Sequence, residues 1–268
     1  MSRGQLDDAT LLMIAQQLPD LEKIQGVALR LHPDFIAIKF NPDSTIPTAA
    51  VCLQDASHTL SDARYAFHEA LAHENWYLKS REIKSEIAAV YFIRYYLDDV
   101  ALRLYSAAEQ LSEAIVYLLE IKADDLRPYK ERMTSRQSIL GNYLRDKLPD
   151  HKITSEILKL ANSGKWREAI QYRNDCVHAQ PPLLKGLGIT YARKQRWTTT
   201  DDGNSYQLGI GGGDEPKYSV EDLYGFIKPS LFMFTGIFSS VLDFYVALLE
   251  QKGFSLDTST KGLSGTII

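Results

Sequence analysis

The stretch from Thr59 to Lys122 constrains the fold most, because it contains neither glycine nor proline. Residues of high helix propensity fill it, first from Thr59 to Ser80 and then from Arg81 to Lys122. Apolar residues recur there at spacings of three and four, as in a helix that packs one face on a core. They are Ile83, Ile87, Val90, Tyr91, Leu104, Ala108, Leu111, Ile115 and Leu118. The sequence therefore predicts two or three long helices.

The composition is that of an ordinary globular protein, with 45% hydrophobic and 24% charged residues among 268. This length predicts one large domain or one domain with additions. The 30 basic and 34 acidic residues give a net charge of −4, so any contact with nucleic acid must be local. Cys52 and Cys176 form no metal or redox motif, and the first residues lack an apolar signal segment. We therefore expect a cytoplasmic protein without metal or cofactor.

Further helices are expected after residue 122. They cover residues 127–149, 154–161 and 164–178, and a final long helix begins after Ser219. Ser219 and the acid three residues later form the pattern of a capping box, in which each side chain bonds a backbone N–H of the first turn.

The apolar run between Lys228 and Glu250 is long enough to resemble a membrane span. Asp243 lies inside it and would cost about 3 kcal/mol to insert. The run also has a polar side, which includes Ser239 and Ser240. This pattern favours a helix in the core of a protein without a membrane partner.

The N-terminal residues have mixed patterns. Residues 7–17 predict a short amphipathic helix. Gly26–Leu31 and Phe35–Phe40 alternate between apolar and polar residues, which predicts a small strand pair.

A second hairpin is expected at about 191–210, where residues 196–200 and 205–208 flank the turn residues Asp201–Asn204. The predicted fold is therefore mainly α. It is a helical domain over 57–268 with this small β-hairpin insertion, and residues 1–56 form a short mixed α/β extension that packs on the helical bundle.

Three patterns carry little functional weight. His68 and His73 are five residues apart, which is one too many for a metalloprotease motif, so two solvent-facing histidines are expected. Gly209–Gly213 lacks the Lys-Ser/Thr that a phosphate loop requires. Glu109 and Glu113 lie four apart on a predicted helix, where they either meet a buried cation or form a solvated face.

The segment Tyr172–His178 is the most informative, because it contains Arg173, Asn174 and His178 on one uninterrupted predicted helix. An Arg, a polar residue and a His at this spacing resemble the motif of the HEPN superfamily (higher eukaryotes and prokaryotes nucleotide-binding), a group of all-α proteins. Arg145 and His151 have the same spacing, but Pro149 breaks the helix between them. The resemblance covers residues 59–252 without the hairpin and predicts a HEPN-like helical bundle.

A helical wheel places Arg173 at the centre of an apolar face formed by Trp166, Ala169, Ile170, Cys176 and Val177. A cation in such a place must find a carboxylate, a phosphate or a partner subunit. Alternatively, Arg173 reaches out to solvent or pairs with Glu109 or Glu113.

The resemblance implies a metal-independent endoribonuclease that uses the 2′-OH of the RNA as nucleophile. His178 would act as general acid/base, because imidazole exchanges protons near neutral pH. Arg173 would hold the scissile phosphate, and Asn174 would orient the imidazole or bond the phosphate. The setting implied is bacterial defence, stress response or a toxin with an antitoxin or other regulatory partner.

Two alternatives remain open, namely a non-catalytic bundle that binds nucleotide or RNA for regulation and a structural arginine in a dimer interface. A homodimer is expected, because a two-fold axis through the motif helix would place two copies of Arg173 and His178 in one cleft. The hairpin residues Arg193, Lys194, Arg196 and Trp197 are candidates for RNA contacts, against the alternative of an ordinary exposed hairpin.

Overall fold

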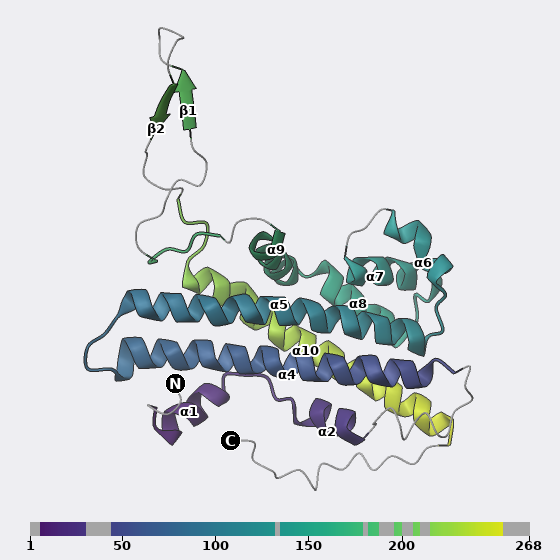
Figure 1. The fold of residues 1–268 in the computed structure, drawn as a ribbon. Coiled ribbons are helices and arrows are strands. Elements are labelled where there is room, and N and C mark those ends of the chain that lie inside the picture. The colour runs from purple at the N-terminus through teal and green to yellow at the C-terminus, as the bar shows by residue number, and fades with distance from the viewer. Residues whose placement is uncertain are drawn as a thin grey trace.

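A computed structural model describes residues 6–30, 44–131, 135–178, 182–187, 196–199, 206–209 and 215–253. The fold is mainly α, a helical bundle (Figure 1). In chain order the helices are α1 (Asp8–Ala15), α2 (Glu22–Arg30), α4 (Ile46–Asn75), the π-helical turn η2 (Trp76–Ser80), α5 (Glu86–Leu118), α6 (Ala123–Lys130), α7 (Arg136–Lys147), α8 (Lys152–Asn162), α9 (Gly164–His178) and α10 (Val220–Gln251). The strands are β1 (Arg196–Thr199) and β2 (Tyr206–Gly209).

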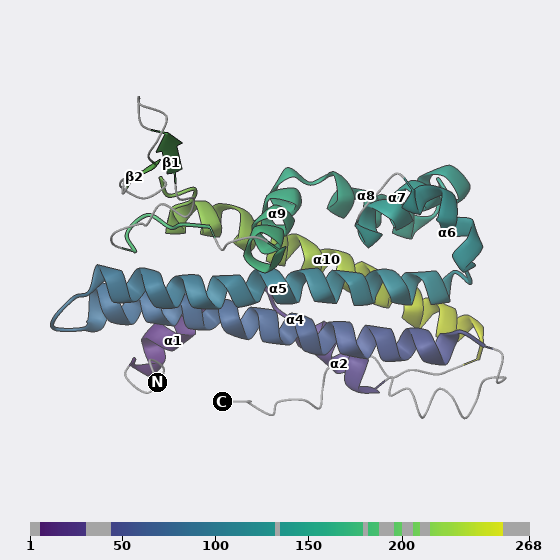
Figure 2. The same cartoon turned by 45° about the horizontal axis from the view of Figure 1, so that its top comes forward.

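Helices α4 and α5 form a long antiparallel pair at the centre of the molecule (Figures 1 and 2). Alanines at every seventh position of α4, namely Ala49, Ala56, Ala63 and Ala70, are fully buried. Helix axes approach more closely where the contacting side chains are small, so this series favours close packing of α4 on the helices that cover it. The expected long helices are present, and α4 begins well before the predicted start at Thr59.

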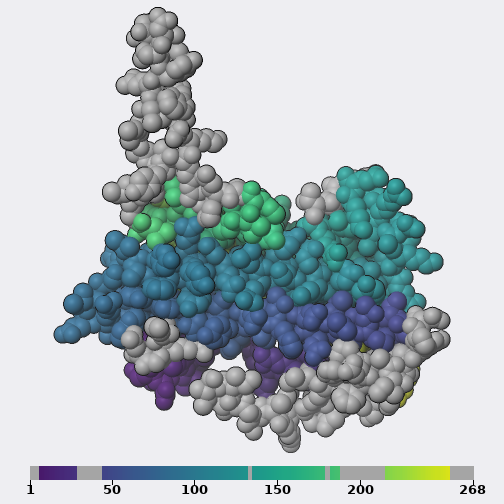
Figure 3. Space-filling model, in the orientation of Figure 1, coloured from purple at the N-terminus to yellow at the C-terminus, as the bar shows by residue number. Residues whose placement is uncertain are grey.

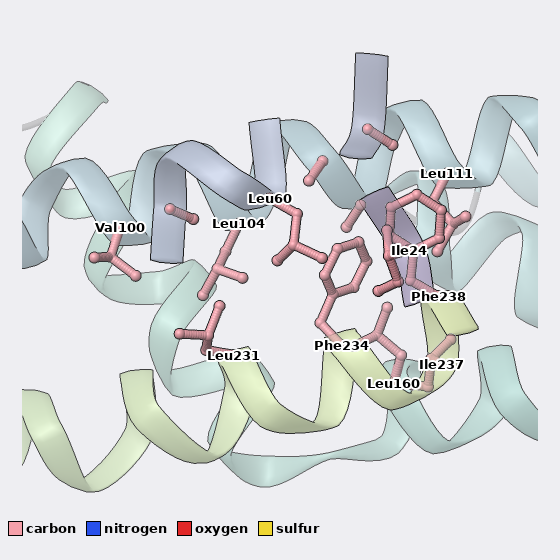
Figure 4. Close-up of a cluster of buried hydrophobic side chains, with 14 of the residues drawn as sticks. Ile24, Leu60, Val100, Leu104, Leu111, Leu160, Leu231, Phe234, Ile237 and Phe238 are labelled. Carbon is pink, nitrogen blue, oxygen red and sulfur yellow. The ribbon is translucent and has the colours of Figure 1, made fainter. Parts of the chain in front are cut away.

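Helix α10 crosses the α4–α5 pair and supplies much of the core (Figure 4). Phe234 and Phe238 are fully buried, and the ring of Phe234 stacks on Trp166 of α9. The predicted capping box is confirmed, because Ser219 and Asp222 bond each other's backbone N–H groups.

By length and composition, α10 is also the one helix of the described residues that could cross a membrane. A core helix passes the same test, and 44% of its most apolar window is buried inside the protein. Asp243 forms an ion pair of 2.7 Å with Lys23 of α2, which places this side of α10 against another helix. These contacts favour the core interpretation over the membrane interpretation.

The N-terminal helices correct one prediction. The strand predicted at Gly26–Leu31 is wrong through residue 30, because helix α2 continues to Arg30. Ile24, Val27 and Ala28 are buried, at the spacing of one helix face, and α2 packs on α4. Phe35–Phe40 lies outside the described residues. The predicted boundary after residue 56 falls inside α4.

The first half of α5 corrects the predicted core face. Ile83, which lies before the start of α5, and Ile87 and Tyr91 within it are exposed, at 75%, 62% and 58%. The buried face instead contains Ala89, Ile93, Leu97 and Val100. Two apolar series run along this half of the helix, and spacing alone does not distinguish the one that faces α4.

Helices α6, α7 and α8 form a group at one end of α5, visible as a teal lobe in Figure 3. The single helix predicted at 127–149 is two helices here, α6 and α7. Pro128 lies in the last turn of α6, and Ser135 begins α7 by accepting a bond from the Ser138 backbone N–H at 3.2 Å.

The strands β1 and β2 pair antiparallel, with Arg196 opposite Gly209 and Thr199 opposite Tyr206. The segments before and after them also pair, because Lys185 N donates to the Tyr218 carbonyl at 2.9 Å. The chain therefore leaves and re-enters the bundle at one place, between α9 and α10.

Candidate functional site

Helix α9 lies over the middle of α5 (Figures 1 and 2). Its buried residues are Trp166, Ala169 and Tyr172. The prediction that Arg173 lies at the centre of the buried face is therefore wrong. Tyr172 is fully buried, Arg173 is half-buried at the edge of the face, and Val177 is 45% exposed.

Asp98 of α5 binds two side chains of α9, Tyr172 and Cys176. Its carboxylate accepts a short hydrogen bond from the Tyr172 hydroxyl and lies 3.6 Å from Arg94 Nε. Cys176 Sγ is 3.8 Å from the same carboxylate. Burial raises the pKa of Asp98 and raises the pKa of Cys176 to about 12, so the thiol is protonated at neutral pH. These contacts hold α9 in one orientation on α5, with Arg173 over Tyr105.

Arg173, Asn174 and His178 lie together, with Arg173 in contact with the other two. Arg173 Nη1 donates to Asn174 Oδ1 at 3.0 Å and lies 3.3 Å from His178 Nε2. The guanidinium carbon is 4.2 Å from the ring centroid of Tyr105 on α5, which is a cation–π contact. Burial raises the pKa of Tyr105, with Glu109 adding to the rise, so the ring is neutral. We call these four residues the Arg173 site.

No carboxylate within the described ranges lies at ion-pair distance from Arg173, and its buried Nε has no acceptor there. The predicted alternative of a pair with Glu109 or Glu113 is wrong, because both bind Arg136 of α7. Arg136 Nε lies 3.5 Å from Glu109 Oε2, and its Nη1 contacts Glu113 closely. A half-buried cation that lacks a carboxylate partner in this part of the chain is suited to bind an anion.

The one acidic residue within the motif is already paired. Asp175 Oδ2 accepts from Lys217 Nζ at 2.5 Å, and its other oxygen accepts from Gln171 at 2.7 Å. Burial alone would raise the pKa of Asp175, but these hydrogen bonds outweigh it and lower the pKa. The contact with Lys217 also ties α9 to the segment that leads into α10.

The hairpin residues are only partly described. Arg193 and Lys194 lie outside the described residues, and for Arg196 and Trp197 the structure gives the backbone of β1 alone. Their contact with RNA stays a prediction. Of the glycines at 209–213, only Gly209 is described, as the last residue of β2.

The second match to the motif does not form a site. Arg145 lies on α7, which ends at Lys147, whereas His151 caps the start of α8. Pro149 stands between the two helices, as the sequence predicts.

His68 and His73 are buried, so the prediction of two solvent-facing histidines is wrong. His73 stacks on Phe92 and Tyr96 of α5, with ring centroids 4.5 and 5.2 Å apart. Its Nδ1 is buried without a hydrogen-bond partner in the described part of the chain. In that part, no group of three or more His, Cys, Asp and Glu side chains is placed to hold a metal ion.

Burial lowers the pKa of His73 from its ordinary 6.5, and the nearby Glu69 acts in the opposite direction. The folded chain therefore binds fewer protons here than the unfolded chain does. We expect the free energy of unfolding to fall as the pH drops below about 6.5 towards the folded-state pKa. His73→Phe keeps a ring in the stack and should flatten this dependence, measured as urea midpoints across that pH range. His58→Phe, on the exposed side of α4, is the control, and an equal flattening there would contradict the assignment.

The sequence gives one overlooked signal for the partners of Arg173. Asp98, Tyr105 and Glu109 are seven and four residues apart, so they share one face of α5. This polar stripe marks the side of α5 on which α9 and α7 pack.

Comparison of the chain with models of known protein families, with curated proteins and with solved structures gives no match. The likeness to HEPN proteins therefore depends on the motif and the helical pattern alone.

Proposed function

We propose that the chain is a metal-independent endoribonuclease of the HEPN type, built as a HEPN-like bundle with a hairpin insertion. The observation that carries the proposal is the state of Arg173. It is a half-buried cation without a carboxylate in the described ranges, and it is in contact with an imidazole and an amide. A phosphodiester supplies the missing anion, and the histidine supplies proton transfer.

The reaction would be an internal transesterification. The 2′-OH attacks the adjacent phosphorus, the bond from phosphorus to the 5′ oxygen breaks, and a 2′,3′-cyclic phosphate forms. His178 would take the proton of the 2′-OH or give one to the leaving 5′ oxygen. Arg173 would stabilise the charge that builds on the phosphoryl oxygens, and Asn174 would hold the guanidinium in place.

The proposal is tested by incubating the purified protein with labelled single-stranded RNA in excess EDTA. We expect cleavage at the same rate as with Mg²⁺, because the proposed chemistry uses only side chains and the 2′-OH. Loss of all activity in EDTA, restored by a divalent metal, would contradict the proposal.

A second candidate function is binding of nucleotide or RNA without cleavage. The observation that favours it is that His178 is the one imidazole that contacts Arg173 in the described residues. One such group serves one proton transfer at a time. RNA that binds with an Arg173-dependent affinity but stays intact would support this function instead.

A homodimer would supply a second imidazole. A two-fold axis near α9 would bring His178 of both chains into one shared cleft. The exposed Val177 would then be covered. We expect light scattering to give twice the chain mass of 30.3 kDa. We also expect phosphate to raise the melting temperature, because it would bind the folded cleft only. A mass of one chain at micromolar concentration would reject the shared cleft.

A further inference from the structure

A groove of about 420 Å³ lies between the end of α5 and helices α6 and α7. Its floor is apolar, formed by Val116, Ile121, Leu126, Ile139 and Leu140. One wall carries the ion-paired cluster of Glu109, Glu113 and Arg136, with Tyr117 beside it. A groove of this volume, in which apolar side chains lie beside a few polar groups, is large enough for a small ligand. We call it the Arg136 groove.

The charges of the Arg136 groove indicate the kind of ligand. Glu109 and Glu113 bring two negative charges, and Arg136 and Lys130 bring two positive charges. Arg136 is already bound to both carboxylates, which leaves Lys130 as the one lining cation without an ion pair in the described residues. The two carboxylates on the same wall would repel a phosphate. A neutral, flat ligand with hydrogen-bonding edges fits better. It can lie on the apolar floor and donate N–H groups to the carboxylates.

The position of the groove relates it to the Arg173 site. Tyr105, under Arg173, and Glu109, on the groove wall, lie four residues apart on the same face of α5. Four residues advance about 6 Å along a helix axis. A nucleotide whose phosphate is held by Arg173 can therefore extend its base towards the groove.

We infer that the Arg136 groove binds a nucleobase of the RNA whose phosphate is held by Arg173, an inference that rests on the proposed function. Unpaired bases are recognised by stacking on aromatic rings or guanidinium planes and by hydrogen bonds to their edges. Tyr117 and Arg136 offer the planes. The carboxylates of Glu109 and Glu113 keep lone pairs beyond those that Arg136 uses, and these accept from exocyclic amino groups. Adenine and cytosine should therefore bind better than uracil, which has no amino group.

The test uses fluorescence anisotropy with short 2′-O-methyl oligomers, which lack the nucleophile and stay intact. The probes are oligo-A, oligo-C, oligo-U and a base-free phosphodiester chain of equal charge. We expect oligo-A and oligo-C to bind at least about fivefold more tightly than the base-free chain, since stacking of one base contributes about 1–3 kcal/mol. Equal binding of all probes would overturn the inference.

The variant Ala123→Trp separates this inference from the proposed function. Ala123 lines the groove, is exposed and is the first residue of α6, so tryptophan there fills the groove without disturbing the core. We expect the preference for bases to disappear while the affinity for the base-free chain stays. Ala9→Trp, at an exposed position in the first turn of α1, is the matched control and should behave as the natural chain.

If the base preference survives Ala123→Trp, the groove is not the base site and the proposed function still stands. If Arg173→Ala leaves the binding of the base-free chain unchanged, the phosphate does not bind at Arg173, and both the inference and the proposed function are overturned.

Discussion

Replacing His178 with alanine is expected to slow RNA cleavage by at least about a hundredfold, the usual contribution of one general acid/base. His178 is exposed and ends α9, so its loss should leave the fold intact. RNA affinity should change little, because Arg173 retains the phosphate contact. The measurement is the single-turnover cleavage rate of His178→Ala. His58→Ala is the control, because His58 is an exposed histidine on α4 and is not part of the Arg173 site.

Arg173 is expected to act on binding and on rate together. Arg173→Ala removes both the phosphate contact and the charge that stabilises the transition state. Arg173→Lys keeps the charge but loses the planar, two-pronged geometry, so it should restore binding more than rate. Arg145→Ala is the control, because Arg145 lies in the motif match that the structure breaks. Full activity of both His178→Ala and Arg173→Ala would contradict a catalytic role for α9.

Phe234→Ala is expected to lower the free energy of unfolding by about 3–5 kcal/mol, as large-to-small changes of a buried phenylalanine do. Phe234 is fully buried in the core, stacked on Trp166 and close to Phe238. The substitution leaves a cavity where α10 meets α9. Urea unfolding followed by circular dichroism measures the loss.

Phe232 provides the matched control on the same helix. It lies two residues before Phe234 and is 42% exposed, so Phe232→Ala should cost less than about 1 kcal/mol. The contrast between the two variants also tests the core interpretation of α10. Equal effects, or a protein that stays in solution only with detergent, would contradict this interpretation.

The sequence predicts the helices of this protein well where local signals are strong. The absence of glycine and proline indicates α4 and α5, and Ser219 with Asp222 marks the start of α10. The motif residues Arg173, Asn174 and His178, which the sequence assigns to one site, also lie together, because the long side chain of Arg173 reaches both Asn174 and His178.

Other features depend on partners that are distant in the sequence. Gly26–Arg30 alternates like a strand, yet burial of Val27 and Ala28 against α4 makes it a helix. Tyr105 and Asp98 become part of the site only because α9 packs on α5. His73 is buried because aromatic residues of α5 cover it, which its spacing from His68 does not indicate.

Analysis of the product ends tests the proposed function most directly. Labelled single-stranded RNA is incubated with the protein in EDTA, and the fragments are identified by mass spectrometry. The proposed chemistry predicts fragments with a 2′,3′-cyclic phosphate and a 5′-OH, which are absent with His178→Ala. Intact RNA, or fragments with a 3′-OH and a 5′-phosphate, would contradict cleavage through the 2′-OH at the Arg173 site.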